Sequence, residues 1–156
     1  MNNRTLKKYA LAIAAFSVFG LAPMGSAYAL KQIQITENVQ MNVGKVGVTA
    51  SGGTVTISPS GTVTAPTGFF LSGSTSAGQF TATGQISTPV QISFSPGTLT
   101  GPGQAITIDN FTTNAGPSPA FDGSGNLTFS VGASIVIAPT QQGGSYSGTY
   151  SVTVIY

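Results

Sequence analysis

The chain ends with GGSYSGTYSVTVIY (residues 143–156), and this stretch alternates between two kinds of residue. From Tyr146 onward every second residue is Tyr or Val, apart from Gly148, and the residues between them are Ser, Thr and Ile. A period of two is typical of a β-strand with one buried face. The stretch therefore predicts a strand that continues to the last residue.

The same alternation recurs through the preceding chain and predicts an all-β protein. Gly or Pro interrupts the pattern every few residues, and no segment shows a convincing helical period. Many short strands with frequent turn signals favour an antiparallel β-sandwich, with loops at 95–104 and 113–126. The predicted strands are 32–43, 53–58, 62–65, 68–71, 79–83, 90–95, 105–111, 126–131, 134–138 and 146–156.

The clearest local prediction is a hairpin in TVTISPSGTVTA (residues 54–65). Alternating apolar residues flank Ser58-Pro59-Ser60-Gly61, which has Pro at the second and Gly at the fourth turn position. A type I turn prefers this arrangement.

The other end of the chain has the pattern of a secretory signal peptide, residues 1–29. A basic start is followed by an apolar run over 9–21 and by Ala27-Tyr28-Ala29, a small-x-small cleavage pattern. A membrane anchor is the alternative, but the run is shorter than the ~20 residues that a spanning helix needs. We therefore expect export, and a single domain over residues 30–156.

Charge is scarce in this predicted domain. Charged residues make up 5% of the whole chain, and from residue 30 onward they are Lys31, Glu37, Lys45, Asp109 and Asp122. Two cations cannot neutralise a run of phosphates, so we expect no nucleic-acid partner. An almost uncharged surface has little repulsion between molecules, which suits packing beside copies of the same chain. The chain has no Cys, and no second apolar stretch is long enough for a membrane span.

Few residues could carry chemistry. The chain has no His and no Cys, so the usual general base and thiol nucleophile are missing. Asp109 and Asp122 could form a carboxylate pair of the kind that glycosidases use. Each has a simpler explanation, because Asp109 closes a predicted strand and Asp122-Gly123 opens a predicted turn. We expect no enzyme and no cofactor.

Asp122, Ser124 and Asn126 also occupy alternate positions, as the first ligands of a calcium loop do. Such a loop needs Gly at its sixth position and Glu at its twelfth, where this chain has Leu127 and Ala133. We therefore expect a plain turn and no metal site.

The N-terminal strand is amphipathic and begins near the predicted cleavage site. In LKQIQITENVQMNV (residues 30–43) the odd positions from Ile33 are apolar, with Glu37 as the exception. Two interpretations remain open from the residues alone. The strand either belongs to its own domain or extends to a neighbouring molecule.

Residues 43–61 and 144–156 resemble a family of secreted bacterial β-domains that are rich in Gly, Thr and Ser and classed as a domain of unknown function; the resemblance covers most of 39–156. The final strand is also similar to those of spore-coat-U-type domains and chaperone–usher pilins. In pilins a Gly lies fourteen residues from the end and an aromatic residue at the end, which correspond to Gly143 and Tyr156. This chain lacks the cysteine pair of classical pilins.

The pilin resemblance implies an immunoglobulin-like antiparallel sandwich that is completed by a donor strand. It also implies a periplasmic chaperone, an usher and copies of the chain as partners, and a fibre or coat subunit that reaches the cell surface through the periplasm. The residues expected to mediate assembly are Ile33, Ile35, Val39, Met41, Val43, Gly143, Tyr146, Tyr150, Val152, Val154 and Tyr156. The alternative is a free-standing secreted β-sandwich that binds glycan or another surface ligand through Phe69, Phe70 or Phe121.

We predict that signal peptidase cleaves the exported chain after Ala29, because the small-x-small pattern ends there. N-terminal sequencing of the exported protein should begin at Leu30. Recovery of a chain that still starts at Met1 would contradict the prediction of export through a cleaved signal.

Overall fold

The computed structural model describes residues 29–47 and 51–156 of the chain. Almost all of the predicted signal peptide, residues 1–29, lies outside the described residues. Every regular element in the described part is a β-strand. A search of this part for a helix with the length and hydropathy needed to cross a bilayer found none.

Ten strands form one eight-stranded sheet and one small two-stranded sheet, and all of their pairings are antiparallel. The main sheet follows the order β1-β6-β9-β8-β7-β10, with β3 beside β9 and β4 beside β3, while β2 pairs with β5. The strands are β1 (Gln34–Val39), β2 (Lys45–Gly47), β3 (Gly53–Ile57), β4 (Val63–Thr64), β5 (Phe70–Ser72), β6 (Gly78–Thr83), β7 (Gln91–Thr100), β8 (Ile106–Thr113), β9 (Asn126–Ile137) and β10 (Ser147–Ile155).

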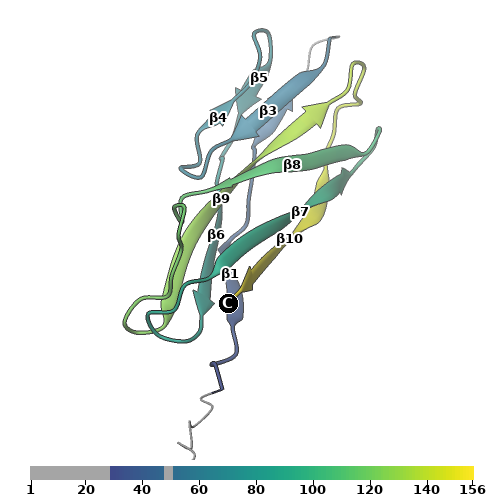
Figure 1. Ribbon diagram of the computed structural model, residues 1–156. Coiled ribbons are helices and arrows are strands. Elements are labelled where there is room, and N and C mark those ends of the chain that lie inside the picture. The colour runs from purple at the N-terminus through teal and green to yellow at the C-terminus, as the bar shows by residue number, and fades with distance from the viewer. Residues whose placement is uncertain (1–28, 48–50) are drawn as a thin grey trace, which may run out of the picture.

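The main sheet curls into a nearly closed barrel (Figure 1). The curl follows from β9, which pairs with β8 along one edge and with both β6 and β3 along the other. The prediction of an antiparallel all-β fold is confirmed. The structure shows one curled sheet, whereas the sequence pattern predicted two sheets packed face to face.

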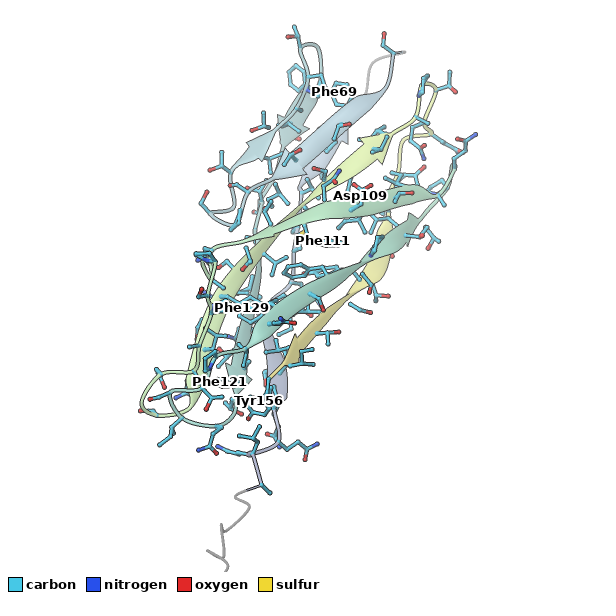
Figure 2. All side chains as sticks on the ribbon, in the orientation of Figure 1. Phe69, Asp109, Phe111, Phe121, Phe129 and Tyr156 are labelled. Atoms are coloured by element: carbon cyan, nitrogen blue, oxygen red, sulfur yellow. The ribbon has the colours of Figure 1, made fainter. Side chains whose placement is uncertain are left out.

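The interior contains two clusters of buried side chains. In the lower cluster the rings of Phe80 and Phe129 stack with centroids 5.7 Å apart, and Phe129 is fully buried (Figure 2). Burying one such side chain contributes about 1.5–3 kcal/mol. The lower cluster comprises Phe80, Ala82, Val90, Phe121, Phe129, Val131 and Val154. The upper cluster comprises Val55, Ile106, Ile108, Ala133, Ile135 and Ile137.

The predicted hairpin at 54–65 is confirmed as β3 and β4. The Gly61 amide donates to the Ser58 carbonyl at 2.9 Å, which closes the four-residue turn that Pro59 and Gly61 indicated. Ile57 lies opposite Val63 in the short ladder beyond the turn.

Two predicted strands at 126–131 and 134–138 are a single strand, β9. An isolated glycine in a strand pattern can mark a close approach between backbones, and Gly132 does so. A Cβ built on Gly132 would overlap the carbonyl oxygen of Ile57. Glycine is needed there because the backbone at Ile57 and Ser58 passes through the space that a side chain at position 132 would fill.

The predicted loop at 95–104 was wrong in its first half, because β7 continues through Pro96 to Thr100. The pairing of β10 with β7 shifts register between Thr149 and Ser151, next to Pro96. A bulge is one of the few places where a strand accepts proline, because a bulged residue does not have to donate a backbone hydrogen bond to the neighbouring strand.

The prediction that Asp109 closes a strand was also wrong. Asp109 and Asn110 lie within β8, where the pairing with β9 shifts register between Asp109 and Thr112. Asn110 has a φ of 47°, a left-handed conformation that asparagine tolerates better than most residues. The bulge therefore bends β8 and does not end it. The strand β2 was not predicted.

We predict that Gly132→Ala lowers the free energy of unfolding by about 1–3 kcal/mol, the usual effect of overpacking. The added methyl group has no space beside the Ile57 carbonyl. Urea unfolding followed by circular dichroism measures the change. Gly123→Ala is the matched control, because a Cβ at Gly123 meets no atom within 4 Å. Equal stability of the two variants would contradict this account of β9.

Candidate functional site

The two edges of the main path, β1 and β10, face each other across an open seam. Among the residues that the structure describes, β1 pairs only with β6, and β10 pairs only with β7. Because each successive pairing along the path is antiparallel, β1 and β10 also run in opposite directions. Both strands reach the same end of the barrel, where the C-terminus lies (Figure 1). Each edge strand has backbone N–H and C=O groups on the side away from its neighbour.

A groove of about 500 Å³ lies along this seam. Ile35 and Met41 line it from the β1 side, and Tyr150 and Val152 from the β10 side. Its apolar lining includes Phe80, Leu99 and Ile108 from β6, β7 and β8. Glu37 is the one charged residue among its lining residues. Polar groups of Gln40, Asn42, Ser147 and Thr149 also line it, so the groove presents a mixed apolar and polar surface between two strand edges.

Tyr150 projects from β10 into the interior beneath this groove. Its ring lies 5.0 Å from that of Phe111 and 6.3 Å from that of Phe80, measured between centroids. Its hydroxyl is buried and has no hydrogen-bond partner among the described residues. Burial, and secondarily the Glu37 carboxylate, raise the pKa of Tyr150 to about 12. A buried hydroxyl without an acceptor is destabilising, so a bound group that supplies an acceptor would be favoured.

Tyr156 closes the lower end of the seam. Its hydroxyl accepts a hydrogen bond from the Gln85 amide at 2.8 Å and donates to the carbonyl of Lys31. Its ring packs against Phe121, with centroids 6.0 Å apart (Figure 2). The last residue is therefore held by the segment that precedes β1 and by the segment that follows β6.

Tyr146 is held in the same way at the upper end. Its hydroxyl accepts from the Gly103 amide at 2.8 Å and from Nε2 of Gln141 at 2.7 Å, and it donates to the Gln142 carbonyl at 2.8 Å. Gln141 is almost fully buried. Tyrosine hydroxyls therefore fix β10 at both ends of the groove.

The structure brings most of the predicted assembly residues to the seam. Ile33 and Val154 pack into the lower cluster, and Tyr156 closes its end. The predicted residues that line the groove are Ile35, Met41, Val43, Tyr146, Tyr150 and Val152.

Val39 and Gly143 do not line the groove. The β1–β6 pairing shifts register between Glu37 and Val39, and this bulge places Val39 opposite Gln79. Gln79 lies between Gly78 and Phe80, whose buried positions mark the inner face of β6, so Val39 is on the outer face. Gly143 lies before β10, and a Cβ there would meet no atom within 4 Å.

The two candidate catalytic carboxylates are not brought together. Asp109 lies on β8 in the upper half of Figure 2, whereas Asp122 follows Phe121 at the lower end. An oxygen of Asp122 accepts hydrogen bonds from the Asn126 and Ser124 amides, both at 2.8 Å, and these bonds lower the pKa of Asp122. The predicted turn is confirmed. Within the described ranges, no three or more carboxylate, His or Cys side chains gather as metal ligands would.

The three phenylalanines proposed as ligand contacts differ in exposure. Phe121 belongs to the lower cluster and is only 2% exposed, so it is not a surface contact. Phe69 packs against the upper cluster. Phe70, on β5, is 79% exposed.

Residues 33–156 match the family described as a domain of unknown function, DUF4402, and the chain belongs to this family. No curated protein and no solved structure matches the chain.

We predict that Asp122→Asn is less stable than the wild type at neutral pH, because a neutral oxygen accepts the Ser124 and Asn126 hydrogen bonds less strongly than a carboxylate. The pKa of Asp122 is lower in the folded state than its ordinary 3.8. Its stabilising effect is therefore fully present above that value and is lost as the pH falls through the lowered pKa. Urea midpoints of both proteins, from neutral pH to about pH 2, should converge in acid. A difference that persists unchanged at low pH would contradict this role.

Proposed function

We propose that this DUF4402 protein is a non-enzymatic structural subunit of a bacterial surface fibre or coat, assembled by strand addition at the seam between β1 and β10. The observation that carries the proposal is the pair of strand edges, unpaired among the described residues, that flank a groove with apolar side chains along it. Backbone hydrogen bonds to such edges give affinity, and alternate side chains entering the groove give register.

The edges also lack the usual protection against pairing. Natural proteins commonly place Lys, Pro or other charges on edge strands to prevent association. β10 has no charged residue and no Pro from Ser147 to Ile155, and β1 has only Glu37. An edge without such residues favours a protein whose edges are used for pairing.

The occupant we propose is the N-terminal strand, residues 30–43, of a neighbouring copy. Ile33 and Ile35 are two positions apart and share one face, as side chains entering the groove would. All six residues of β1 are exposed, so its side chains bury little surface in its own sheet. A single added strand runs antiparallel to one edge and parallel to the other, because the edges themselves are antiparallel. We also propose that this donor strand completes an immunoglobulin-like fold.

The proposal includes export and transit partners. Uncovered strand edges make a protein prone to aggregation before assembly. A periplasmic chaperone that covers the edges, and an usher that passes the subunit to the cell surface, would meet this need. The predicted signal peptide and the pilin-like final strand support this route.

A second candidate function is glycan binding by a free-standing secreted domain. The observation behind it is the ring of Phe70 on β5, which is 79% exposed and could contact a ligand. Loss of sugar binding in Phe70→Ala, with a wild-type protein that is a stable monomer on its own cell surface, would support this function over fibre assembly.

We predict that Ile35→Asp abolishes assembly, because its carboxylate would be buried without a partner when the groove fills. Such burial costs several kcal/mol, and about 1.4 kcal/mol is a tenfold change in an equilibrium constant. Polymer recovered from the cell surface is measured by native molecular weight and electron microscopy, and folding by circular dichroism.

Thr36→Asp is the matched control, since Thr36 is exposed and lies opposite Thr81 on the outer face of β6. It should assemble normally. Wild-type protein that stays monomeric when recovered from its own cell surface would overturn the proposal, as would equal assembly of the two variants.

A further inference from the structure

We infer that the strand around Gln34 pairs antiparallel with the same strand of a second copy, about a twofold axis at Gln34, to form a closed dimer. This inference does not rest on fibre assembly. It follows from the order of residues in the strand and from where the barrel begins.

The sequence Lys31-Gln-Ile-Gln-Ile-Thr-Glu37 is complementary to itself when it is paired antiparallel around its centre. In this register Lys31 of each copy lies opposite Glu37 of the other, and Ile33 lies opposite Ile35. The polar residues Gln32 and Thr36 are opposite each other on the other face. Opposite charges and apolar pairs directly across an antiparallel ladder are stabilising.

The charge pattern is specific because charge is so rare in this protein. Residues 30–156 contain five charged side chains, and two of opposite sign lie three residues before and three after Gln34. Glu37 is also the one charged residue that lines the groove. Lys31 of a second copy would therefore place its ammonium group where the groove has an isolated carboxylate.

The backbone at this position has no strand partner on its open side, although the Lys31 carbonyl accepts a hydrogen bond from the Tyr156 hydroxyl. Residues 31–33 precede β1 and pair with no strand in the described part of the chain. Within residues 29–47 and 51–156, β1 itself pairs with a strand on one side only, and that strand is β6. Residues 31–33 of one copy can therefore lie along Ile35–Glu37 of the other, and the reverse.

This arrangement places most of each barrel on its own side of the axis. Gln34 is the first residue of β1, so the strands of each barrel extend away from the axis, while Tyr156 and Gln85 lie beside Lys31 and have to make room for the partner strand. In Figure 1 the segment before β1 leaves the barrel at its lower end. Antiparallel pairing centred on Gln34 places the second barrel beyond that end, pointing in the opposite direction.

The contact between Tyr156 and Lys31 competes with the dimer. The Tyr156 hydroxyl donates to the Lys31 carbonyl at the lower end of the seam, and a partner strand must displace it. The contact therefore favours the monomer. Because a twofold contact closes on itself, the dimer also occupies the N-terminal strands of both copies and does not itself extend a fibre.

The direct test is a disulfide on the axis. The chain contains no Cys, so Gln34→Cys creates a single thiol per molecule. At a twofold axis the two thiols face each other, and mild oxidation of the exported protein should give a disulfide-linked dimer. Thr36→Cys is the matched control, because Thr36 is equally exposed on the same strand but lies opposite Gln32 of the partner. It should crosslink far less.

The second test reverses the charges. Lys31→Glu and Glu37→Lys each place like charges opposite one another at both ends of the ladder, whereas the double variant restores two opposite pairs. Two such pairs change an association constant by roughly two- to thirty-fold. Sedimentation equilibrium at low salt should therefore show weaker dimers for each single variant and recovery in the double variant. Tyr156→Phe, which removes the competing hydroxyl, should strengthen the dimer.

The outcomes separate this inference from the proposed function. Crosslinking at Gln34 with charge rescue, in a protein that never polymerises, would support the dimer and overturn fibre assembly. Polymers that form without crosslinking at Gln34 and are indifferent to both charge reversals would support the fibre and overturn the dimer. Equal crosslinking of Gln34→Cys and Thr36→Cys would overturn the inferred register.

Discussion

The fold depends on one long strand, β9, which has to pair with three neighbours. β8 lies along one of its edges, while β6 and then β3 divide the other. Its inward side chains, among them Phe129 and Val131, supply the centre of the lower cluster. A single strand that serves both halves of the sheet forces the sheet to curl, and the curl brings β1 and β10 to the same side. The seam is therefore a consequence of how β9 is shared.

The seam between β1 and β10 is bordered by side chains that hold β10 in place. Tyr150 reaches from β10 across the interior, and its hydroxyl lies against Gly78 of β6, where a Cβ would be only 2.5 Å away. Tyr146 and Tyr156 fix the two ends of β10 to other segments. β10 is held at both ends by side chains, while its outer backbone edge has no neighbouring strand in the described part of the chain. The barrel can therefore be stable while the outer edge of β10 stays available for pairing with another strand.

Much of this could be predicted from local pattern. The strand at 146–156, the hairpin around Pro59 and the turn at Asp122 each depend on residues close in sequence, and each was predicted. The sequence pattern predicts breaks at Gly132 and Pro96, because the strands that accommodate these two residues are distant in the sequence. The bulge after Glu37 likewise moved Val39 to the outer face. Leu99 and Ile108 could not be assigned to the groove, since only the curl of the sheet brings them there.

The position of Tyr156 also determines how the protein can be labelled. A tag fused after this residue begins beside the hydroxyl that holds Lys31 and Gln85, and a tag fused before Leu30 adjoins the strand that we expect to be exchanged or paired. Either fusion would perturb the seam that it was meant to report on. The loop at Gly116 is the better place, because it is exposed and a Cβ there would meet no atom within 4 Å. An epitope inserted at this loop leaves the residues of β1 and β10 unchanged.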